Sequence, residues 1–376
     1  MNPIFVNKYL HFGEQDSKKT VLFLFFILLP VAALLPHAHA LCALFCVLLF
    51  ALGIRDRGWS TLLFSGRARQ FLLFLTLCLS GLVLPAARGA TLLSVLLRLS
   101  FFLPLLFAEY ERTFRRILSF VGGVLGVLAV FEVLLGFGKE GYADTSLFAS
   151  LSRAGGVFGN PNILAAFLLT PAIFALSDAL FEKNPALPLV CFCGAASGIA
   201  ASYSRGALLA LFASATLLLV RRFGVWRVFF TVLALLPLTT LLLPKALTAR
   251  LLSMVSPDTS VSYRFSLWKS ILRLSPHTLL FGVGEGHEAL LSALSPVLAS
   301  GLLQVEHTHS LYFHLLVSMG IFGVIFFLLL CVRALLRGKS RSARAALLSL
   351  LIFGIFDDPL YSGQTEVIFW LTLGLC

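Results

Sequence analysis

Long apolar runs follow one another along this 376-residue chain and limit its fold more than any other feature. A run of roughly 17 to 22 apolar residues can cross the hydrocarbon core of a bilayer as an α-helix. Two shorter apolar runs, separated by D-D-P-L-Y-S-G-Q, occupy residues 346–376. Including these, the sequence predicts an all-α, polytopic integral membrane protein with about twelve transmembrane helices. The longer candidate spans lie near residues 20–36, 38–54, 70–86, 91–108, 117–137, 161–180, 186–203, 206–220, 228–243 and 309–331.

The composition excludes a soluble protein of this length, because 59% of the residues are hydrophobic and only 12% are charged. The net charge of +12 has a topological explanation. With a cytoplasmic N-terminus, the predicted inner loops hold about two thirds of the 29 Lys and Arg residues, as cytoplasmic loops usually do. Both termini are therefore predicted to be cytoplasmic, and the first apolar run to be a retained helix. The basic residues are expected to contact anionic lipids and not nucleic acid.

The seven cysteines all lie in apolar runs, where a cysteine behaves as a small hydrophobic residue. The sequence therefore predicts neither a disulfide framework nor a zinc site. Arg98, inside a predicted span, is an exception among the apolar residues. It either pairs with another group inside the bundle or extends along its own helix to the outer membrane surface.

The largest hydrophilic segment, residues 244–306, is predicted to be an extracytoplasmic loop long enough to build a lid. Within it, V-S-Y-R-F-S-L-W-K-S-I-L-R-L reads as an amphipathic surface helix whose apolar side is centred near Trp268. Arg264 falls inside that apolar stripe. Interfacial helices place Arg on the solvated side, so either the assumed phase is wrong or Arg264 points into a cavity. The sequence favours the cavity.

Polar residues also mark helix starts at the same predicted membrane boundary. In G-N-P-N, Asn160 suits an N-cap and Pro161 the first helical position, whereas Asn162 is not needed for capping. A helix N-terminus of this kind can also hold an anion. Arg205 follows in A-S-Y-S-R-G, between two spans with almost no loop, and it is either an interfacial anchor or a substrate contact.

The stretch E-H-T-H-S leads directly into an apolar helix. At about 100° per residue, Gly320 shares the helical face of His309 with Gly323 beside it, so this face is predicted to pack into the bundle. His307, His309 and His314 do not share one face as metal ligands would, and His314 is expected to be a packing residue. Asp357 and Asp358 could pair with the arginines, orient a histidine, or only cap and turn the chain.

The predicted topology places these residues together at the outer membrane boundary. Arg205 and Arg264, always charged and rich in donors, suit a phosphate or pyrophosphate. His309 suits removal of a proton from a hydroxyl near neutral pH. This combination predicts a lipid-linked pyrophosphate donor attacked by a sugar hydroxyl.

At these residues the sequence resembles the O-antigen ligase family and its relatives, the O-antigen polymerases and bacterial protein O-oligosaccharyltransferases. The family's histidine motif is His, then Asn, Ser or Gln, nine residues, Gly, two residues, and Gly, Thr or Tyr. It is met by His309, Ser310, Gly320 and Gly323. The family's arginine motif, Arg followed by three residues and Leu, is met by Arg205 and Leu209. The resemblance spans roughly residues 155–330 and implies a GT-C-like fold. It also implies metal-independent, inverting glycan transfer from an undecaprenyl-pyrophosphate carrier.

The expected protein is thus a glycosyltransferase of the bacterial cytoplasmic membrane, with residues 1–158 as scaffold helices and residues 159–376 as the catalytic region. The catalytic residues are expected to be His309, Arg205 and Arg264, without metal or other cofactor. Substrate contacts are expected from Asn160, Asn162, His307 and Asp358. The expected acceptor is lipid A-core or another glycan. A polymerase using the same donor is the alternative within this class, and a lipid-linked sugar transporter is the alternative outside it.

Overall fold

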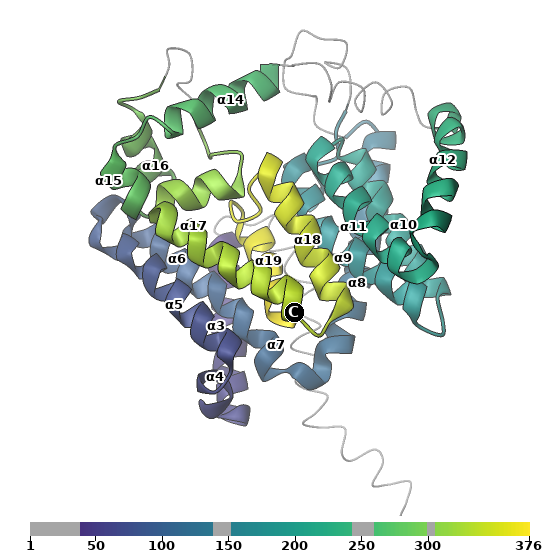
Figure 1. The fold of residues 1–376 in the computed structure, drawn as a ribbon, viewed down its shortest axis with the longest axis horizontal. Coiled ribbons are helices and arrows are strands. Elements are labelled where there is room, and N and C mark those ends of the chain that lie inside the picture. The colour runs from purple at the N-terminus through teal and green to yellow at the C-terminus, as the bar shows by residue number, and fades with distance from the viewer. Residues whose placement is uncertain (1–37, 138–151, 243–258, 299–304) are drawn as a thin grey trace, which may run out of the picture.

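The computed structural model describes residues 38–137, 152–242, 259–298 and 305–376. Helices dominate all four ranges, and no β-strand element occurs in them (Figure 1). Seven helical stretches in these ranges are long and apolar enough to cross a membrane. The prediction of an all-α polytopic membrane protein is confirmed to that extent, and the predicted span at 20–36 lies outside the described residues.

The first group of helices, before residue 138, consists of hairpin-linked spans joined by 3-10 turns. Pro85 begins one of these turns, η2 (Pro85–Ala87), and Pro104 lies in the first turn of the short helix α7, where its missing N–H is tolerated. Its α-helices are α3 (Ala38–Arg57), α4 (Ser60–Leu63), α5 (Gly66–Leu79), α6 (Arg88–Arg98), α7 (Leu103–Leu106) and α8 (Glu111–Leu134).

The most enclosed candidate span is α9 (Pro161–Phe181), of which 83% is buried. It packs against α8, α10 (Ala186–Ala201) and α11 (Arg205–Phe223), and α12 (Val225–Leu242) lies outside them next to α11. Glycines let α8 and α10 approach closely, because a side chain at Gly126 would meet the Gly194 carbonyl oxygen at 2.0 Å. This half of the molecule is held together by backbone proximity as well as by apolar side chains.

Three helices from the predicted outer loop gather beside the start of α17 (Figure 1). They are α14 (Thr259–Ile271), α15 (Pro276–Phe281) and α16 (His287–Leu294). The predicted amphipathic helix is present as α14, but its apolar side is rotated from the predicted one. Leu267 and Ile271 are fully buried, whereas Phe265 and Leu272 are exposed. The phase was wrong because the aromatic side chains were assumed to mark the buried side.

The helix α17 (Leu311–Arg337) is broken at Gly320, whose φ of 67° is left-handed. Two carbonyl oxygens freed by the break accept hydrogen bonds from the segment before α16: Val283 N donates to Val317 O (2.8 Å) and Gly284 N to Ser318 O (2.9 Å). The prediction that His309 and Gly320 share one helical face is wrong. His309 precedes the helix with a φ of 52°, so the 100° rule does not connect the two residues.

The last two helices, α18 (Arg341–Phe356) and α19 (Gly363–Leu375), form a hairpin in the centre of the molecule (Figure 1). Their connection lies beside the start of α17, where Leu311 N donates to Asp357 O (3.2 Å). At the opposite end, Lys339 N donates to Cys376 O (2.9 Å). The α18–α19 turn therefore reaches the same end of the bundle as residues 305–310 and α14.

Candidate active site

Residues 305–310, which precede α17, are fixed by bonds to two other elements. Trp268 Nε1 on α14 donates to Thr308 O (3.0 Å), and Ser310 Oγ donates to Gly354 O on α18 (3.2 Å). Thr308 Oγ1 also closes a local turn by donating to Ser310 O (2.8 Å). The left-handed φ of His309 is thus held between α14 and α18, and its ring is directed at the α18–α19 turn.

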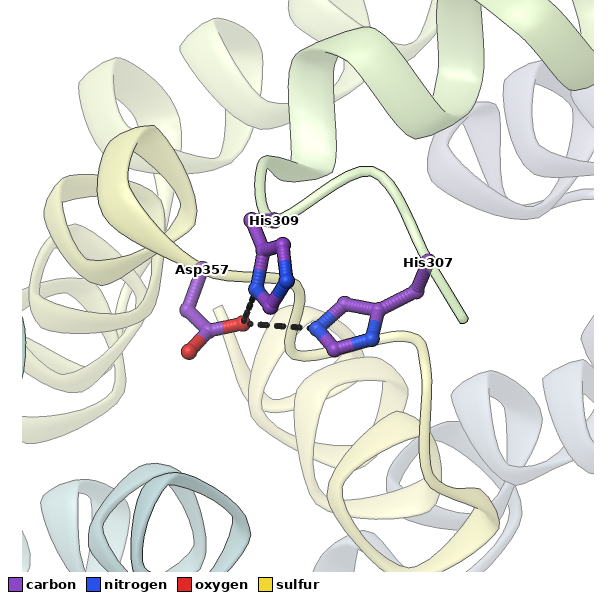
Figure 2. Close-up of side chains that lie close together, drawn as sticks. All are labelled: His307, His309 and Asp357. Carbon is purple, nitrogen blue, oxygen red and sulfur yellow. Dashed lines mark hydrogen bonds and ion pairs between the residues drawn. The ribbon is translucent and has the colours of Figure 1, made fainter. Parts of the chain in front are cut away.

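Two histidines face one carboxylate at this turn (Figure 2). His307 Nε2 lies 3.3 Å from Asp357 Oδ1, and His309 Nδ1 lies 3.8 Å from the same oxygen. The first distance is a hydrogen bond, and the second is beyond hydrogen-bond range. The two imidazole rings lie side by side with centroids 3.9 Å apart, and His307 also stacks on Tyr361.

Arg264 reaches the same carboxylate from α14. Its Nη1 donates to Phe356 O (2.6 Å), and its Nη2 lies 3.7 Å from Asp357 Oδ2. The ring of the neighbouring Tyr263 meets His309 edge-on at 5.9 Å. The rotated phase of α14 explains this inward direction of Arg264, which shares the buried side with Leu267 and Ile271. A cation, a carboxylate and two imidazoles therefore meet within one small volume.

The environment of the site changes two pKa values. Burial lowers the pKa of His309, an effect only partly offset by Asp357, so its imidazole is neutral at neutral pH. Burial alone would raise the pKa of Asp357. The hydrogen bond with His307, the nearby His309 ring and the Arg264 charge outweigh burial and hold that pKa well below its usual range. The site thus combines a neutral imidazole with an ionised carboxylate.

The structure places Arg205 at the first position of α11, close to the same turn. Gly206 beside it lies so near α18 that a side chain there would meet Phe356 Cβ at 3.0 Å. Asn160 caps α9 by accepting from Asn162 N and Ile163 N. Asn162 Oδ1 accepts a hydrogen bond from Arg153 Nη2 (3.2 Å). Arg153 also donates from Nε to Ser202 O (2.9 Å). The two asparagines thereby order the start of α9.

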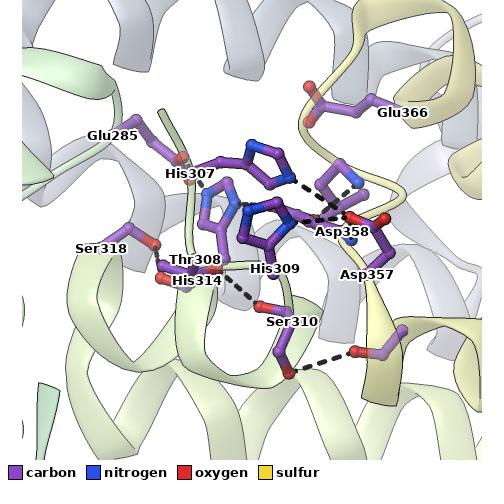
Figure 3. A network of polar contacts seen from close by, with 12 residues as sticks. Glu285, His307, Thr308, His309, Ser310, His314, Ser318, Asp357, Asp358 and Glu366 are labelled. Carbon is purple, nitrogen blue, oxygen red and sulfur yellow. Dashed lines mark hydrogen bonds and ion pairs between the residues drawn. The ribbon is translucent and has the colours of Figure 1, made fainter. Parts of the chain in front are cut away.

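Of the two aspartates, Asp357 faces the histidines of the site, and Asp358 turns the other way. Asp358 Oδ1 accepts from Leu360 N (2.9 Å), while Oδ2 is hydrogen-bonded to His314 Nδ1. His314 Nε2 lies 2.7 Å from Glu285 Oε2 (Figure 3). His314 was expected to be a packing residue, and this is wrong because both of its ring nitrogens are bound to carboxylates.

Sequence reasoning missed Glu285 and left Arg98 undecided. Arg98 is fully buried and pairs with Glu285 Oε1 (2.6 Å) and Glu366 Oε1 (3.0 Å), so it does not extend to the membrane surface. The signal for Arg98 was its charge within an apolar run. Glu285 carried a weaker signal, a lone carboxylate within G-V-G-E-G. Pairing the two required knowledge of which helices meet.

Donor atoms of His307, His309 and Asp357 lie within 4.8 Å of one another and could hold a divalent cation. Two observations fit this poorly. Arg264 already places a positive charge 3.7 Å from the carboxylate. In addition, buried His307 Nδ1 has no hydrogen-bond partner among the described residues, whereas a ligating histidine usually donates its second N–H to one. The histidine spacing alone did not reveal this trio, because its carboxylate, Asp357, comes from the α18–α19 turn, far along the chain from the two histidines.

The fold and the site define a polytopic helical membrane protein with a cation–carboxylate–histidine site at one end of its bundle. In a comparison with protein families, the model described as O-antigen ligase matches residues 189–328. This match confirms the predicted similarity to the O-antigen ligase family over about a third of the chain. It includes Arg205, Arg264, His307 and His309 but not Asp357. A comparison with curated proteins found no match.

Proposed function

We propose that this protein transfers a glycan from an undecaprenyl-pyrophosphate carrier to an acceptor hydroxyl, with inversion, at the outer face of the bacterial cytoplasmic membrane. The family match supports O-antigen ligase-type handling of a lipid-linked glycan and a glycan acceptor. Lipid A-core is one acceptor of this class. The observation that carries the proposal is the meeting of His309, Asp357 and Arg264 beside the start of a membrane-spanning helix.

In this mechanism His309 is the general base. Its Nδ1 faces Asp357, which favours the tautomer with the proton on Nδ1 and leaves the lone pair of Nε2 for the acceptor. Nε2 removes the hydroxyl proton as the acceptor oxygen attacks the anomeric carbon. The bond between that carbon and the pyrophosphate oxygen breaks, and its electron pair leaves with the carrier. Ionised Asp357 stabilises the imidazolium that forms.

Arg264 and Arg205 are the proposed pyrophosphate ligands. A guanidinium has five N–H groups, more than the contacts of Arg264 with Phe356 and Asp357 require. Positive charge at the leaving pyrophosphate stabilises the transition state without a divalent cation. His307 and Asn162 are proposed as further substrate contacts. Asn160 caps α9 and Asp358 is hydrogen-bonded to His314, so both are proposed to hold the surrounding elements in place and not to contact the substrate.

The decisive experiment is a transfer assay with protein purified in detergent and an authentic undecaprenyl-pyrophosphate glycan, with and without EDTA. Glycan moved as a block to a non-carrier acceptor, at a rate unaffected by EDTA, would establish the ligase. A product ladder that stays on the carrier would identify a polymerase instead. No consumption of the authentic donor would overturn the enzyme assignment and favour transport.

His309→Ala tests the assignment of the base. Transfer is expected to fall by at least about 10² while the protein still folds, since general bases contribute roughly 10² to 10⁴. The matched control is His277→Ala, which removes an exposed histidine of α15 and is expected to leave transfer unchanged. Retention of most activity in His309→Ala would contradict the mechanism.

A further inference from the structure

Five ionisable side chains form a continuous, largely buried chain of contacts behind the candidate site. Figure 3 labels Asp358, His314, Glu285 and Glu366 of this chain. Asp358 bonds to His314, His314 to Glu285, Glu285 to Arg98, and Arg98 to Glu366. The side chains of Arg98 and Asp358 are fully buried, and those of Glu285 and Glu366 are 4% and 3% exposed. The proposed mechanism uses none of the four residues beyond Asp358.

The hydrogen bonds fix the charge of His314. Each of its ring nitrogens faces a carboxylate oxygen, so both nitrogens carry a proton when the two carboxylates are ionised. Arg98 supplies a second cation. Its Nη1 donates to Cys78 Sγ (2.7 Å), and its guanidinium lies 5.7 Å from the ring centroids of Phe74 and Trp370. The two cations offset the charges of Asp358 and Glu285, whose side chains are buried, and the His314 side chain between them is 19% exposed.

This buried chain is joined directly to the catalytic carboxylate. Asp358 N donates to Asp357 Oδ1 (2.9 Å), which is the oxygen that faces His307 and His309. Fixing the Asp358 side chain by His314 therefore fixes the orientation of Asp357. At the other end, Glu285 follows Gly284, whose N–H closes the break of α17. Glu285 thus holds α6, the broken half of α17 and the α18–α19 turn together.

We propose that Glu285, acting through His314 and Asp358 and secured by Arg98, is a positioning residue for Asp357. It touches neither substrate nor base in this assignment. Its structural effect, a rigid α18–α19 turn, is independent of the reaction. Its catalytic effect rests on the function proposed above.

The direct test is hydrogen exchange of residues 355–362 in the purified protein, compared between wild type and Glu285→Gln. The variant is expected to raise exchange at Asp358 and Leu360, whose N–H groups bond within the turn. Asp178→Asn is the matched control. It also breaks a buried ion pair, with Arg115 (3.1 Å), but at the far end of α9, so it should leave this turn unchanged.

A second variant tests the same proposal in case Glu285→Gln does not fold. The triple variant Arg98→Gln, Glu285→Gln, Glu366→Gln removes the arginine and both carboxylates that it pairs with, so none of the three is left as an unpaired buried ion, and His314 keeps Asp358. It is also expected to raise exchange in residues 355–362. Unchanged exchange there in a folded variant would overturn the proposal.

Kinetics distinguish positioning from general stability. Glu285→Gln is expected to lower kcat about tenfold with little change in KM, because the donor contacts remain. Groups facing His309 are Tyr263, Arg264, His307 and Asp357. Since Asp357 raises the pKa of His309, a misplaced Asp357 should move the acid limb of the kcat profile to lower pH. Asp178→Asn should not move it. Faster hydrogen exchange in Glu285→Gln with an unchanged kcat and pH profile would overturn only the catalytic effect of Glu285. A wild-type protein without transfer activity would overturn only the proposed function.

Discussion

Asp357 is the residue at which the contacts of His307, Arg264 and the α18–α19 turn meet. Its Oδ1 accepts from His307 and from the backbone of Asp358, and its Oδ2 is near Arg264. The hydrogen bond and the nearby positive charge keep it ionised despite burial. A neutral side chain of the same shape would leave the donors around it but remove the charge that stabilises a protonated His309.

Asp357→Asn is therefore expected to lower kcat by about 10² while leaving the fold intact, because it removes charge without removing volume. Steady-state transfer kinetics would measure this. Glu288→Gln, which neutralises an exposed carboxylate on α16, serves as the control and should behave as wild type. Wild-type kcat in Asp357→Asn would show that the carboxylate does not act on the base.

The pH dependence follows from the lowered pKa of His309. The base form is unprotonated, so kcat should rise with pH through the pKa in the enzyme–substrate complex and then level off. Because burial lowers the pKa of this imidazole, the midpoint is expected below the ordinary value of about 6.5. A pH profile of kcat for the wild type measures it. A midpoint above 6.5 would indicate a different titrating group.

The role of a residue was predictable from the sequence where a polar or charged side chain interrupts an apolar pattern. Arg264 stood out against an apolar stripe, and His309 against the start of an apolar helix. The choice between Asp357 and Asp358 was not predictable, since neighbours in a tight turn point in opposite directions. The partner of Arg98 was also hidden, because Glu285 lies 187 positions away.

At the scale of elements, the break in α17 shapes the whole end of the bundle. Gly320 adopts a left-handed φ, and a side chain there would lie 2.1 Å from Leu280 O. The sequence predicted close packing at Gly320 but described the helix as continuous. Propensity alone does not reveal a break whose carbonyls are satisfied by a distant segment, here the N–H groups of Val283 and Gly284.

Gly320→Ala is expected to destabilise the protein by about 3 kcal/mol or more, because the left-handed backbone and the carbonyl contact both resist a methyl group. Thermal unfolding in detergent would measure the loss. Gly89→Ala on α6 is the matched control, since no atom lies within 4 Å of the added carbon, and it should be neutral or slightly stabilising. Equal melting temperatures for the two variants would refute the role of the break.

For the whole molecule, seven helical stretches among the described residues confirm the membrane class, while the predicted number of about twelve depends partly on residues outside that set. Hydropathy predicts spans because each must be apolar. It does not predict how spans pack, so the contribution of Arg98 on α6 to a network with α17 and α19 was not foreseen.

The predicted orientation can be tested in intact cells with a membrane-impermeant maleimide. A cysteine at the exposed His277 position on α15 is expected to react from outside. One at the exposed Lys339 position between α17 and α18 is expected to react only after the cells are opened. Both variants are made with the exposed native Cys193 replaced by Ser, and the remaining native thiols, which are buried, should stay unlabelled in both. The reverse pattern would invert the topology and place the candidate site in the cytoplasm.

The break in α17 also limits the movement of the segment whose N–H groups complete it. Withdrawing residues 283–284 would leave the carbonyls of Val317 and Ser318 without donors inside an apolar span, at several kcal/mol for each group. This part of the segment between α15 and α16 is therefore expected to keep its place against α17. In the function proposed above, a lipid-linked donor would therefore have to reach the site without displacing residues 283–284.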